Sequence, residues 1–436
     1  MTGTPGRGLI LAAPSSGAGK TTVTLGILAA LTARGEAVRG AKSGPDYIDP
    51  QFHAAATGRP CVNLDAWAMA PEMIRSLAAG PGTLILEGAM GLFDGAADGS
   101  ATGRGSCADL ARALNLPVVL VVDAARMAHS VAPLVAGFAH HDPQLRIAGV
   151  ILNKVGSPRH EALLRGALTP LGVPVLGALH RDASLGTPSR HLGLVQAEER
   201  RDLREFLDRA GSRVAEAVDL DALLALTAPL PTPNPATHIP PLGQRIGVAR
   251  DEAFAFAYPH LLAAWRAAGA DLLEFSPLAN DPVPAGADAI FLPGGYPELH
   301  AGRLASATAF LDSLRTAAKA GTRIYGECGG YMVLGEGLED VDGARHAMAG
   351  LLRLETSFAK RKLHLGYRQL TPLGGLFDTA MSGHEFHYAR TLRAEGAPLF
   401  AAQDAAGTAL PEMGLREGSV AGSFAHLIAP TPVATA

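Results

Sequence analysis

The first half of the chain alternates short apolar runs with longer stretches that have helical spacing. Four of the runs are apolar without interruption, which is typical of parallel strands buried on both faces of a sheet. The segments between them have the length and spacing of crossover helices. This pattern predicts a doubly wound parallel α/β sheet. The expected strands are GLILAAP, LILEGAM, PVVLVVD and AGVILNKV, and the expected helices include TTVTLGILAALTARG and SCADLARALNL.

A second α/β domain is expected after a proline-rich segment. Residues 228–243, APLPTPNPATHIPPLG, contain six prolines and little that could form a core, so they predict a semi-extended linker. The alternation then resumes, with QRIGVAR, ADLLEFSPL, ADAIFLPGG and TRIYGEC as expected strands and YPHLLAAWRAAG and ASATAFLDSLRTAAKAG as expected helices. We therefore expect a first domain over 1–227, the linker, and a second doubly wound domain over 244–436.

The composition is that of a soluble globular protein, and it narrows the expected partners and compartment. The net charge of -4 comes without a basic run, which argues against nucleic-acid binding. The three cysteines are an odd number at wide spacings, which is normal for a reduced compartment and poor material for disulfides. The first apolar run is too short for a signal peptide or a membrane span. We therefore expect a cytoplasmic protein without nucleic-acid or membrane partners.

The segment APSSGAGKTT, residues 13–22, follows the first expected strand and opens directly into a helix. Its small residues let backbone N–H groups converge on phosphate oxygens, and the helix N-terminus favours their negative charge. Lys20 could neutralise terminal phosphates, and the Thr21 hydroxyl could bind Mg²⁺. Pro14 replaces the first glycine of G-x-x-x-x-G-K-[ST], but strand, loop, GKT and helix occur in order. The segment predicts nucleotide binding by Ser16, Gly17, Ala18, Gly19, Lys20, Thr21 and Thr22.

Two further segments place charged residues at strand ends of the same sheet. AKSGPDYIDPQFH contributes Lys42, Asp46 and Asp49, and LILEGAMGLFDG contributes Glu87 and Asp94. Because the carboxyl ends of neighbouring parallel strands face one crevice, these groups should converge near the phosphates. Asp46 and Glu87 could complete a Mg²⁺ site with Thr21. Asp49 and Asp94 would then remain for the substrate. The alternative is that each acid is an ordinary turn or cap residue.

Two other residues at strand ends have a functional and an ordinary interpretation. Lys42 could offset charge on a transferring phosphoryl group, or it could be a surface lysine. Asn153 closes the strand AGVILNKV and could hydrogen-bond an adenine edge, or it could cap the next turn.

The segment RIYGECGGYMVLGEG places Cys328 between glycines at the end of an expected buried strand. The pattern favours a nucleophile elbow, in which a sharp bend leaves the side chain projecting. A small buried thiol beside a turn is the alternative. A thiol nucleophile needs a base and an oxyanion site. His426 in GSFAHLIAP could be the base, although an ordinary histidine is the alternative. Candidate oxyanion donors are the backbone N–H groups of Gly294, Gly295 and Gly329.

Taken in order, a set of long segments resembles one known family. The segments are APSSGAGKTT, KSGPDYIDPQFH, LILEGAMGLFDG, GVILNKVGSPRH, RIGVARDEAFAFAYPHLL, FLPGGYPELH, GECGGYMVL and GHEFHY. They look like the cobyrinic or hydrogenobyrinic acid a,c-diamide synthases, and the resemblance runs from about residue 8 to 428. KSGPDYIDP and ARDEAFAF in one polypeptide make it specific.

The resemblance implies an amidotransferase of corrin-ring assembly that uses ATP, Mg²⁺ and L-glutamine. The N-terminal domain is similar to dethiobiotin synthetase, and the C-terminal domain to class I glutaminases of the cobyric acid synthase type. By this analogy Cys328 attacks the glutamine amide, His426 shuttles the proton, and ammonia travels inside the protein to the first domain. There ATP phosphorylates the a and c acetate carboxylates of the macrocycle, and ammonia displaces phosphate from each acyl phosphate.

The resemblance also assigns roles to individual residues. Thr21, Asp46 and Glu87 match the family's metal-binding positions, and Asp49 and Asp94 match acids near the carboxylate being activated. The segment GHEFHY could line the glutamine pocket or form an edge-strand pair; its candidates are His384, Glu385, His387 and Tyr388.

One departure from the family concerns the histidine. The family commonly ends in H-x-H, but Ile428 stands where the second histidine is expected. The glutaminase would then depend on a Cys-His dyad, or on another residue that fixes the imidazole tautomer.

Two alternative functions are weighed against the diamide synthase. A cobyric acid synthase would amidate other corrinoid carboxylates with the same machinery. A switch ATPase of the MinD and ParA group would carry a C-terminal amphipathic helix and no thiol chemistry, whereas this sequence has a second α/β domain with an elbow. The expected partner is a small corrinoid substrate. A homodimer is the assembly to test, because dimers are common among such enzymes.

Overall fold

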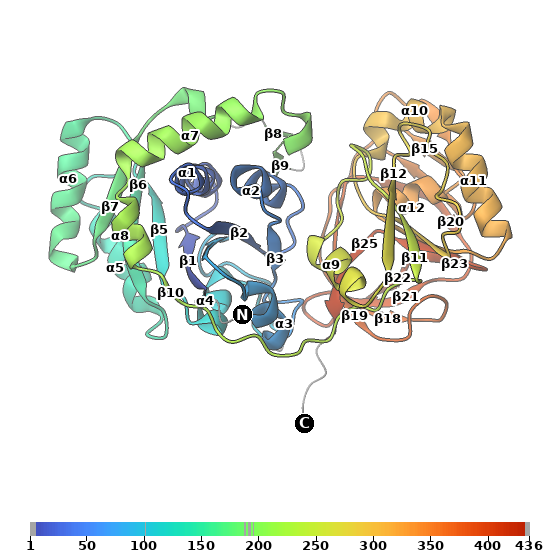
Figure 1. Ribbon diagram of the computed structural model, residues 1–436, viewed down its shortest axis with the longest axis horizontal. Coiled ribbons are helices and arrows are strands. Elements are labelled where there is room, and N and C mark those ends of the chain that lie inside the picture. The colour runs from blue at the N-terminus through green and yellow to red at the C-terminus, as the bar shows by residue number, and fades with distance from the viewer. Residues whose placement is uncertain (1–5, 101, 187–188, 191–192, 195, 432–436) are drawn as a thin grey trace. The chain divides into compact units, whose positions relative to one another are not determined.

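The computed structural model describes residues 6–100, 102–186, 189–190, 193–194 and 196–431. The chain divides into two compact units, the first ending at Ala236 and the second beginning at Thr237 (Figure 1). This division falls inside the predicted linker. The first two linker residues, Ala228 and Pro229, form a short strand that pairs with the first strand of the chain.

The first unit is built on a sheet whose neighbouring long strands are all parallel. The order β3-β2-β4-β1-β5-β6-β7 puts β1 in the interior, and the short β10 joins β1 antiparallel. The expected doubly wound parallel sheet is thus confirmed. Its strands are β1 (Arg7–Ala12), β2 (Val38–Ser43), β3 (Val62–Leu64), β4 (Thr83–Glu87), β5 (Val118–Asp123), β6 (Ile147–Val155), β7 (Val175–His180) and β10 (Ala228–Pro229), with a separate small hairpin of β8 (Ser189–Arg190) and β9 (Gly193–Leu194).

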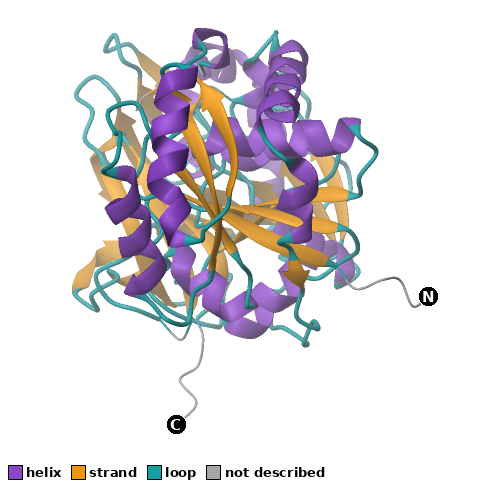
Figure 2. Cartoon of the chain, turned by 90° about the vertical axis from the view of Figure 1, so that its left-hand side faces the viewer, coloured by secondary structure: helices purple, strands orange, loops and turns teal. Residues whose placement is uncertain are grey.

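Helices cover both faces of this sheet, which fans out in the usual twist (Figure 2). Figure 1 shows α1, α2 and α7 on one side and α3 and α4 on the other. Helix α1 packs closely on α7 because Gly26 lacks a Cβ, which would lie 2.4 Å from a methyl carbon of Val214. The helices are α1 (Lys20–Ala33), α2 (Asp49–Thr57), α3 (Pro71–Ala78), α4 (Cys107–Leu114), α5 (Val131–His141), α6 (Pro158–Leu168), α7 (Leu203–Ala217) and α8 (Leu220–Ala225), with 3₁₀ turns at Thr169–Leu171, Ala183–Leu185 and Ala197–Glu199.

The second unit has a sheet of the order β12-β11-β13-β14-β24-β23, in which only the edge strand β23 is antiparallel to its neighbour. All four strands expected here from the sequence are present, so the second α/β domain is confirmed. Its strands are β11 (Arg245–Ala249), β12 (Asp271–Phe275), β13 (Ala289–Leu292), β14 (Arg323–Glu327), β23 (Leu415–Glu417) and β24 (Val420–Ser423).

The helices of the second unit follow the expected positions, with one break. The segment predicted as a single helix from residue 305 is interrupted at Ala307, where one short helix ends and the next begins. The helices are α9 (Pro259–Ala267), α10 (Ala301–Ser306), α11 (Thr308–Lys319) and α12 (Gly329–Leu334), with a 3₁₀ turn at Pro297–His300.

Two further sheets in the second unit were not expected from the sequence. Their orders are β16-β15-β17-β20 and β22-β21-β18-β19-β25. Residues 383–387 of the segment GHEFHY lie on β19, between β18 and β25, so this is an interior strand and the edge-strand interpretation is wrong. The strands are β15 (Gly337–Glu339), β16 (Arg345–Ala347), β17 (Arg353–Ser357), β18 (His364–Pro372), β19 (Met381–His387), β20 (Arg390–Glu395), β21 (Phe400–Gln403), β22 (Ala409–Met413) and β25 (Ala425–Pro430).

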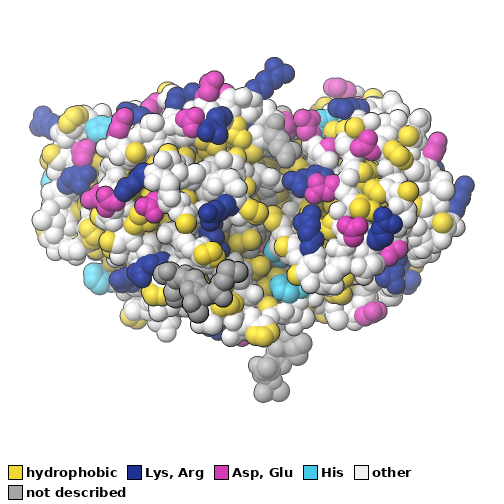
Figure 3. Space-filling view, in the orientation of Figure 1, with side chains coloured by type: hydrophobic (Ala, Val, Ile, Leu, Met, Phe, Trp, Pro, Cys, Tyr) yellow, Lys and Arg dark blue, Asp and Glu magenta, His cyan; other side chains and the backbone are white. Residues whose placement is uncertain are grey.

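The surface carries charges of both signs. On the face drawn in Figure 3, basic and acidic side chains are interspersed. None of the helices in the described part of the chain combines the length and the apolar character that a membrane span requires.

Candidate active sites

The loop between β1 and α1 has the geometry of a phosphate cradle. Gly17 and Gly19 have φ of +79° and +84°, a left-handed conformation that residues with a Cβ rarely adopt. A Cβ on Gly19 would also lie 2.3 Å from the amide nitrogen of Asn153. Helix α1 begins at Lys20, so its first N–H groups have no partner within the helix and point toward the loop. The loop therefore offers backbone donors and a helix N-terminus to an anion.

Buried ionic groups gather beside this loop. Lys42 and Glu87 are register partners in the β2–β4 pairing, and the Lys42 ammonium lies 2.7 Å from a Glu87 oxygen. It also lies 2.5 Å from Asp49 Oδ2, at the start of α2. The Thr21 hydroxyl donates to Glu87 Oε1 at 2.6 Å and lies 3.4 Å from Asp49 Oδ2. The expected convergence of strand-end groups near the loop is thus observed for Lys42, Asp49 and Glu87.

His53 belongs to the same cluster, and the sequence reasoning gave it no role. It lies on α2, is fully buried, and its Nε2 is 2.7 Å from Glu87 Oε2. The space for its ring depends on Gly40 of β2, where a Cβ would lie 2.9 Å from His53 Cβ. Each oxygen of Glu87 therefore has a charged or polar partner. The available signal was the histidine closing PDYIDPQFH, one helical turn after Asp49.

The buried side chains of the cluster hold their charges by mutual pairing. Burial raises the pKa of Asp49 to about 6, and the neighbouring acids Asp46 and Glu87 add to the effect against Lys42. Burial acts in the same sense on Glu87, but Lys42 and His53 outweigh it and hold the pKa of Glu87 well below its usual range. Burial opposes a charge on His53, but its contacts with Cys61 and Glu87 raise the pKa of His53 to about 10. Glu87 is therefore ionised at neutral pH, whereas Asp49 titrates near it.

Asp46 and Asp94 serve local turns in this structure. Asp46 Oδ1 accepts from the N–H groups of Ile48 and Asp49, at 2.8 and 3.1 Å, and so caps the start of α2. Asp94 is exposed, and its Oδ2 accepts from the Gly91 N–H at 2.8 Å. One carboxylate oxygen of Asp46 and one of Asp94 thus accept local backbone hydrogen bonds, as the turn and cap interpretation expects. Among the acids of the set, it is Asp49 and Glu87 that contact Thr21.

The loop lysine is engaged within the chain. Lys20 is buried, and its ammonium donates to the backbone oxygen of Met90 in the loop after β4. Burial, and then the charge of Lys42, lower the pKa of Lys20. A phosphate in the loop would give this ammonium a charged acceptor in place of a neutral carbonyl.

A cavity of about 450 Å³ adjoins the loop and is large enough for a small ligand. It is bordered by the loop at Gly19 and Thr22, by Asn153 and Lys154 at the end of β6, and by residues of 179–186 and α7. Asn153 donates one amide N–H to Ala18 O at 2.9 Å, which leaves its side-chain oxygen and second N–H for another partner. The sequence-based choice between an adenine contact and a turn cap therefore remains a prediction.

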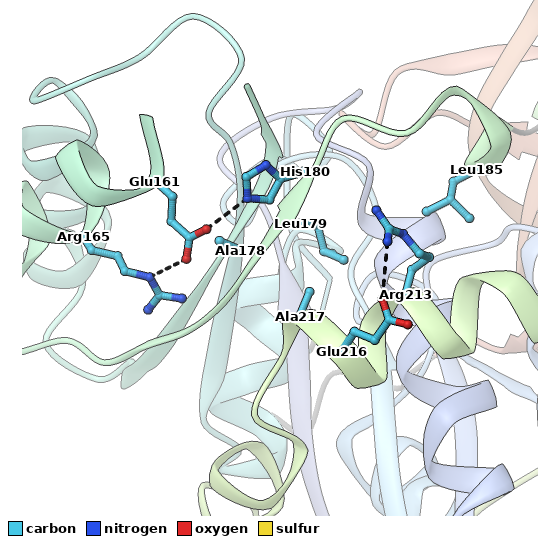
Figure 4. Close-up of a pocket in the computed structure, with 9 residues that line it drawn as sticks. All are labelled: Glu161, Arg165, Ala178, Leu179, His180, Leu185, Arg213, Glu216 and Ala217. Carbon is cyan, nitrogen blue, oxygen red and sulfur yellow. Dashed lines mark hydrogen bonds and ion pairs between the residues drawn. The ribbon is translucent and has the colours of Figure 1, made fainter. Parts of the chain in front are cut away.

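A neighbouring cavity of about 420 Å³ shares three lining residues with the first, namely Leu179, His180 and Leu185. Figure 4 shows Glu161 between Arg165 and His180 on one side, and Arg213 with Glu216 on the other. Because these charges already pair with one another, this cavity is a weaker ligand site than the one beside the loop.

In the second unit, Cys328 stands at a sharp bend between β14 and α12. Its φ of +47° is a left-handed value for a residue that carries a Cβ, which is the strain expected of an elbow. Glycines permit the bend, because a Cβ on Gly330 would lie 1.9 Å from Leu292 O and one on Gly329 would lie 3.0 Å from Gly295 N. The elbow predicted from the sequence is therefore present.

His426 and Gly294 meet at this elbow. A Cβ on Gly294 would lie 2.8 Å from His426 Nε2 and 3.2 Å from Cys328 Cβ, so imidazole, thiol and glycine backbone share one small space. His426 is fully buried on β25. The structure thus brings together the predicted thiol, base and oxyanion residues, which are Cys328, His426, Gly294, Gly295 and Gly329.

A carboxylate that the sequence reasoning passed over faces the histidine. Glu327 closes β14, directly before Cys328, and its Oε2 lies 3.6 Å from His426 Nδ1. Its other oxygen accepts the Leu427 N–H at 3.0 Å. Ile428, at the position of the family's second histidine, is buried, and its carbonyl oxygen lies 2.9 Å from His260 Nε2.

Burial sets the protonation of these three side chains. It raises the pKa of Cys328 well above its usual range, and the negative charge of Glu298 adds to this. It raises the pKa of Glu327 to about 8, against the Leu427 N–H. Burial, and then His384 and His387, lower the pKa of His426 to about 3. The resting site therefore holds a neutral thiol and a neutral imidazole at pH 7.

The GHEFHY segment lies next to the histidine and carries a buried charge pair. His384 is the register partner of His426 between β19 and β25. The carboxylate of Glu385 pairs with Arg368 of β18 at 2.7 Å and with His387 at 2.9 Å. These partners lower the pKa of Glu385 to about 2, although burial opposes its charge. Arg368 had no sequence signal, since it becomes a neighbour only through the β18–β19 pairing.

Two residue sets could be considered for a metal ion. His364, Glu385 and His387 have ligand atoms within 4.8 Å of one another, but the Arg368 guanidinium on Glu385 opposes a second cation there. In the first unit, the oxygens of Thr21, Asp49 and Glu87 are hard donors of the kind that Mg²⁺ prefers, and the Lys42 ammonium already contacts both acids. The set in the first unit offers oxygens alone, whereas the set in the second unit includes two imidazoles.

Comparison with known proteins agrees with this pair of sites. Residues 9–195 match the model of the CobQ/CobB/MinD/ParA nucleotide binding domain. Residues 245–432 match the model of the CobB/CobQ-like glutamine amidotransferase domain. The chain is therefore a glutamine-dependent amidoligase of two α/β domains. The first description also covers switch ATPases, but the second domain is specific to amidotransferases.

The relatives identify the family. The chain is 57% identical to the hydrogenobyrinate a,c-diamide synthase of Brucella abortus, a match that covers 97% of this chain and 98% of the relative. The enzymes of the same name from Rhizobium meliloti and Rhodobacter capsulatus are 56% and 53% identical, each over 97% of this chain and 99% of the relative. The chain belongs to the hydrogenobyrinate a,c-diamide synthase family.

The raised pKa of Glu327 predicts a pH-dependent stability. The folded-state pKa of about 8 exceeds the ordinary value of 4.5. The contribution of Glu327 to the free energy of unfolding is therefore fully present below pH 4.5 and is lost as the pH rises through 8. The loss is about 1.4 kcal/mol per pH unit between those values. The neutral amide of Glu327→Gln does not titrate, so the variant does not lose this stability. Its free energy of unfolding relative to the unsubstituted chain should therefore rise by roughly 3 kcal/mol between pH 5 and 8.

Urea unfolding at several pH values tests this. The chain has two tryptophans, Trp67 in the first unit and Trp265 in the second, so Trp265 fluorescence in a Trp67→Phe background reports on the unit that contains Glu327. A stability difference that stays constant from pH 5 to 8 would show that Glu327 is already ionised throughout this range.

Proposed function

We propose that this protein converts the a and c acetate carboxylates of hydrogenobyrinic or cobyrinic acid into amides, with ATP and the amide nitrogen of glutamine, in cobalamin biosynthesis. The observation that carries the proposal is the presence of two separate chemistries in one chain. The first unit has a phosphate loop beside a buried acid cluster, and the second has a thiol at an elbow with an imidazole. The names of the full-length relatives support the choice of substrate.

The need for two chemistries follows from the reactivity of a carboxylate. A free carboxylate is a poor acyl donor and must first gain a leaving group. In the proposed reaction ATP phosphorylates the carboxylate, and ammonia then attacks the acyl phosphate and releases phosphate. Ammonia itself comes from glutamine by thiol attack on the side-chain amide.

In the first unit, the loop from Ser16 to Thr22 binds the phosphates of ATP, and Asn153 contacts the adenine. Lys20 leaves Met90 O for a phosphate oxygen, and Lys42 offsets charge on the phosphoryl group in transfer. Thr21 and Glu87, with either Asp46 or Asp49, would hold Mg²⁺, which would supply positive charge to the phosphate oxygens. Asp94 would face the substrate carboxylate, and Asp49 would join it where Asp46 completes the metal site.

In the second unit, Cys328 is the nucleophile and His426 accepts its proton. The sulfur electron pair forms the bond to the amide carbon while the oxygen gains negative charge, which the backbone N–H groups of Gly294, Gly295 and Gly329 stabilise. His426 then returns the proton to the departing ammonia. Water hydrolyses the thioester to glutamate.

The glutamine site requires groups that recognise a zwitterion. The Glu385 and Arg368 pair supplies both signs of charge in a buried place, and Glu385 acts electrostatically on the Cys328 thiol. We assign the α-carboxylate of glutamine to Arg368 and its α-ammonium to Glu385. His384, His387 and Tyr388 then line the same pocket.

Three finer points stay predictions of the same proposal. They are the magnesium ion, the cytoplasmic location and the homodimer. The fit of the hard oxygens around Thr21 supports the first, and the composition supports the second.

Cys328→Ser should separate the two reactions. Because serine retains the fold but lacks an acidic, nucleophilic thiol, glutamine-dependent amidation should fall by about 10³-fold or more. Amidation supported by ammonium chloride should keep its rate. The assay follows corrinoid amide formation by mass spectrometry, and glutamine-dependent activity that survives would show that Cys328 is not the nucleophile.

Glu87→Gln should produce the reverse pattern. The neutral amide weakens the cluster around Thr21 and Lys42, so ATP-dependent amidation should fall by about 10²-fold with either nitrogen source. Glutamine hydrolysis by the second unit should persist. Glu161→Gln, on α6 of the same unit, is the matched control and should leave both rates unchanged. Equal loss of both activities in Glu87→Gln would mean that these acids are misassigned.

Arg368→Gln should raise KM for glutamine. Loss of one charge-assisted hydrogen bond to the α-carboxylate corresponds to about a tenfold or larger increase. The rate with ammonium chloride should not change, which also verifies folding. Arg393→Gln, which removes a guanidinium paired with Glu336, is the control. An unchanged KM for glutamine would place the α-carboxylate elsewhere.

A further inference from the structure

The histidine of the second site lacks the expected partner two residues downstream. In a strand, residues two apart point to the same face, so the side chain of residue 428 would be the natural neighbour of His426. Ile428 is buried there, and an aliphatic side chain can neither donate nor accept a hydrogen bond. The orientation of the imidazole therefore comes from other elements, one of which is the backbone of Phe256, whose hydrogen bond with the ring raises the pKa of His426 against burial.

Glu327 is the acid that faces the imidazole. It lies at the carboxyl end of β14, and its Oε2 is 3.6 Å from Nδ1 of His426, on the side of the ring opposite the nitrogen near Gly294 and Cys328. Both side chains are buried, with exposed fractions of 2% and 0%. Ligand-free sites commonly show such contacts longer than their working hydrogen-bond length.

The carboxylate is anchored so that this oxygen stays in place. Its Oε1 accepts the N–H of Leu427, the residue directly after His426. The strand that presents the imidazole therefore also fixes the carboxyl group, and only Oε2 is directed at the ring. The Tyr325 side chain also acts on this carboxyl group and lowers its pKa, so the imidazole is one of three partners of Glu327, beside Tyr325 and the Leu427 N–H.

We propose that Glu327 is the positioning residue of the glutaminase: its carboxyl group accepts the Nδ1–H of His426, fixes the tautomer, and when ionised offsets the imidazolium charge. The inference rests on the proposed roles of Cys328 and His426. Glu327 directly precedes Cys328 in the chain, so the bend that positions the thiol also positions the carboxyl group.

The proton balance follows directly. With Nδ1–H donated to Glu327, the lone pair of Nε2 faces the Cys328 thiol. During attack the S–H bond breaks, an Nε2–H bond forms, and the sulfur pair makes the bond to the amide carbon. The imidazolium so formed lies beside the carboxylate and later gives the Nε2 proton to the leaving ammonia. The reacting form is the one in which Glu327 has already lost its proton, and because burial raises the pKa of Glu327 to about 8, this form becomes more populated as the pH rises toward 8.

Glutaminase kinetics of Glu327→Gln test the inference in the full-length protein. Glutamine still accepts the Leu427 N–H but cannot offset an imidazolium, so kcat for glutamine hydrolysis should fall by about 10²- to 10⁴-fold with little change in KM. Glu327→Asp, which retains the charge, should recover at least tenfold of that loss, about 1.4 kcal/mol. Amidation with ammonium chloride should be unchanged in both, and Glu412→Gln, on the exposed face of β22, is the control.

A double substitution shows whether Glu327 acts through His426. In a His426→Ala background, Glu327→Gln should lower kcat no further, because residues that act as a unit are not additive. The inference would be overturned if Glu327→Gln lowered kcat by the same factor in the unsubstituted chain and in His426→Ala. It would also be overturned if Glu327→Gln alone left kcat unchanged. If Cys328→Ser still hydrolyses glutamine, the proposed function fails instead, so the two failures are distinguishable.

Discussion

Both sites depend on one constraint of parallel sheets: a residue that closes a strand is held rigidly by the ladder while its side chain clears the sheet edge. Glu87 closes β4, Asn153 lies near the end of β6, and Glu327 closes β14 directly before the elbow. Glycines then let the backbone turn where a Cβ would collide, as at Gly19 and Gly330. The candidate functional residues are therefore positioned by the parallel sheet of each unit.

The two units treat buried charge in opposite ways. In the first, Lys42 and His53 pair with Glu87, and the cluster is charged before any ligand arrives. In the second, the thiol and imidazole are neutral at rest because burial disfavours their charged forms. The cluster of the first unit is therefore ionic, whereas the thiol and the imidazole of the second unit are neutral without a ligand.

Much of this architecture was predictable because continuous apolar runs and glycine-rich bends are local signals. The strands, the phosphate loop and the elbow followed from such runs. The partners of the functional residues did not, since His53 meets Glu87, and Arg368 meets Glu385, only after distant strands pair. The strands β15 to β18 and β20 to β22 were also missed, because many of their residues are exposed and carry no apolar run. Glu327 was adjacent to the expected nucleophile, but sequence alone does not show which way its side chain turns.

The central claim is that nitrogen from glutamine replaces a carboxyl oxygen of a corrinoid that ATP has activated. The most direct measurement incubates the purified protein with ATP, Mg²⁺ and glutamine labelled with ¹⁵N in its amide, together with the metal-free or the cobalt-loaded diacid, and weighs the products. The account predicts a diamide of at least one macrocycle that carries two labelled nitrogens. Unchanged masses for both macrocycles, with the label recovered only as free ammonium, would contradict it.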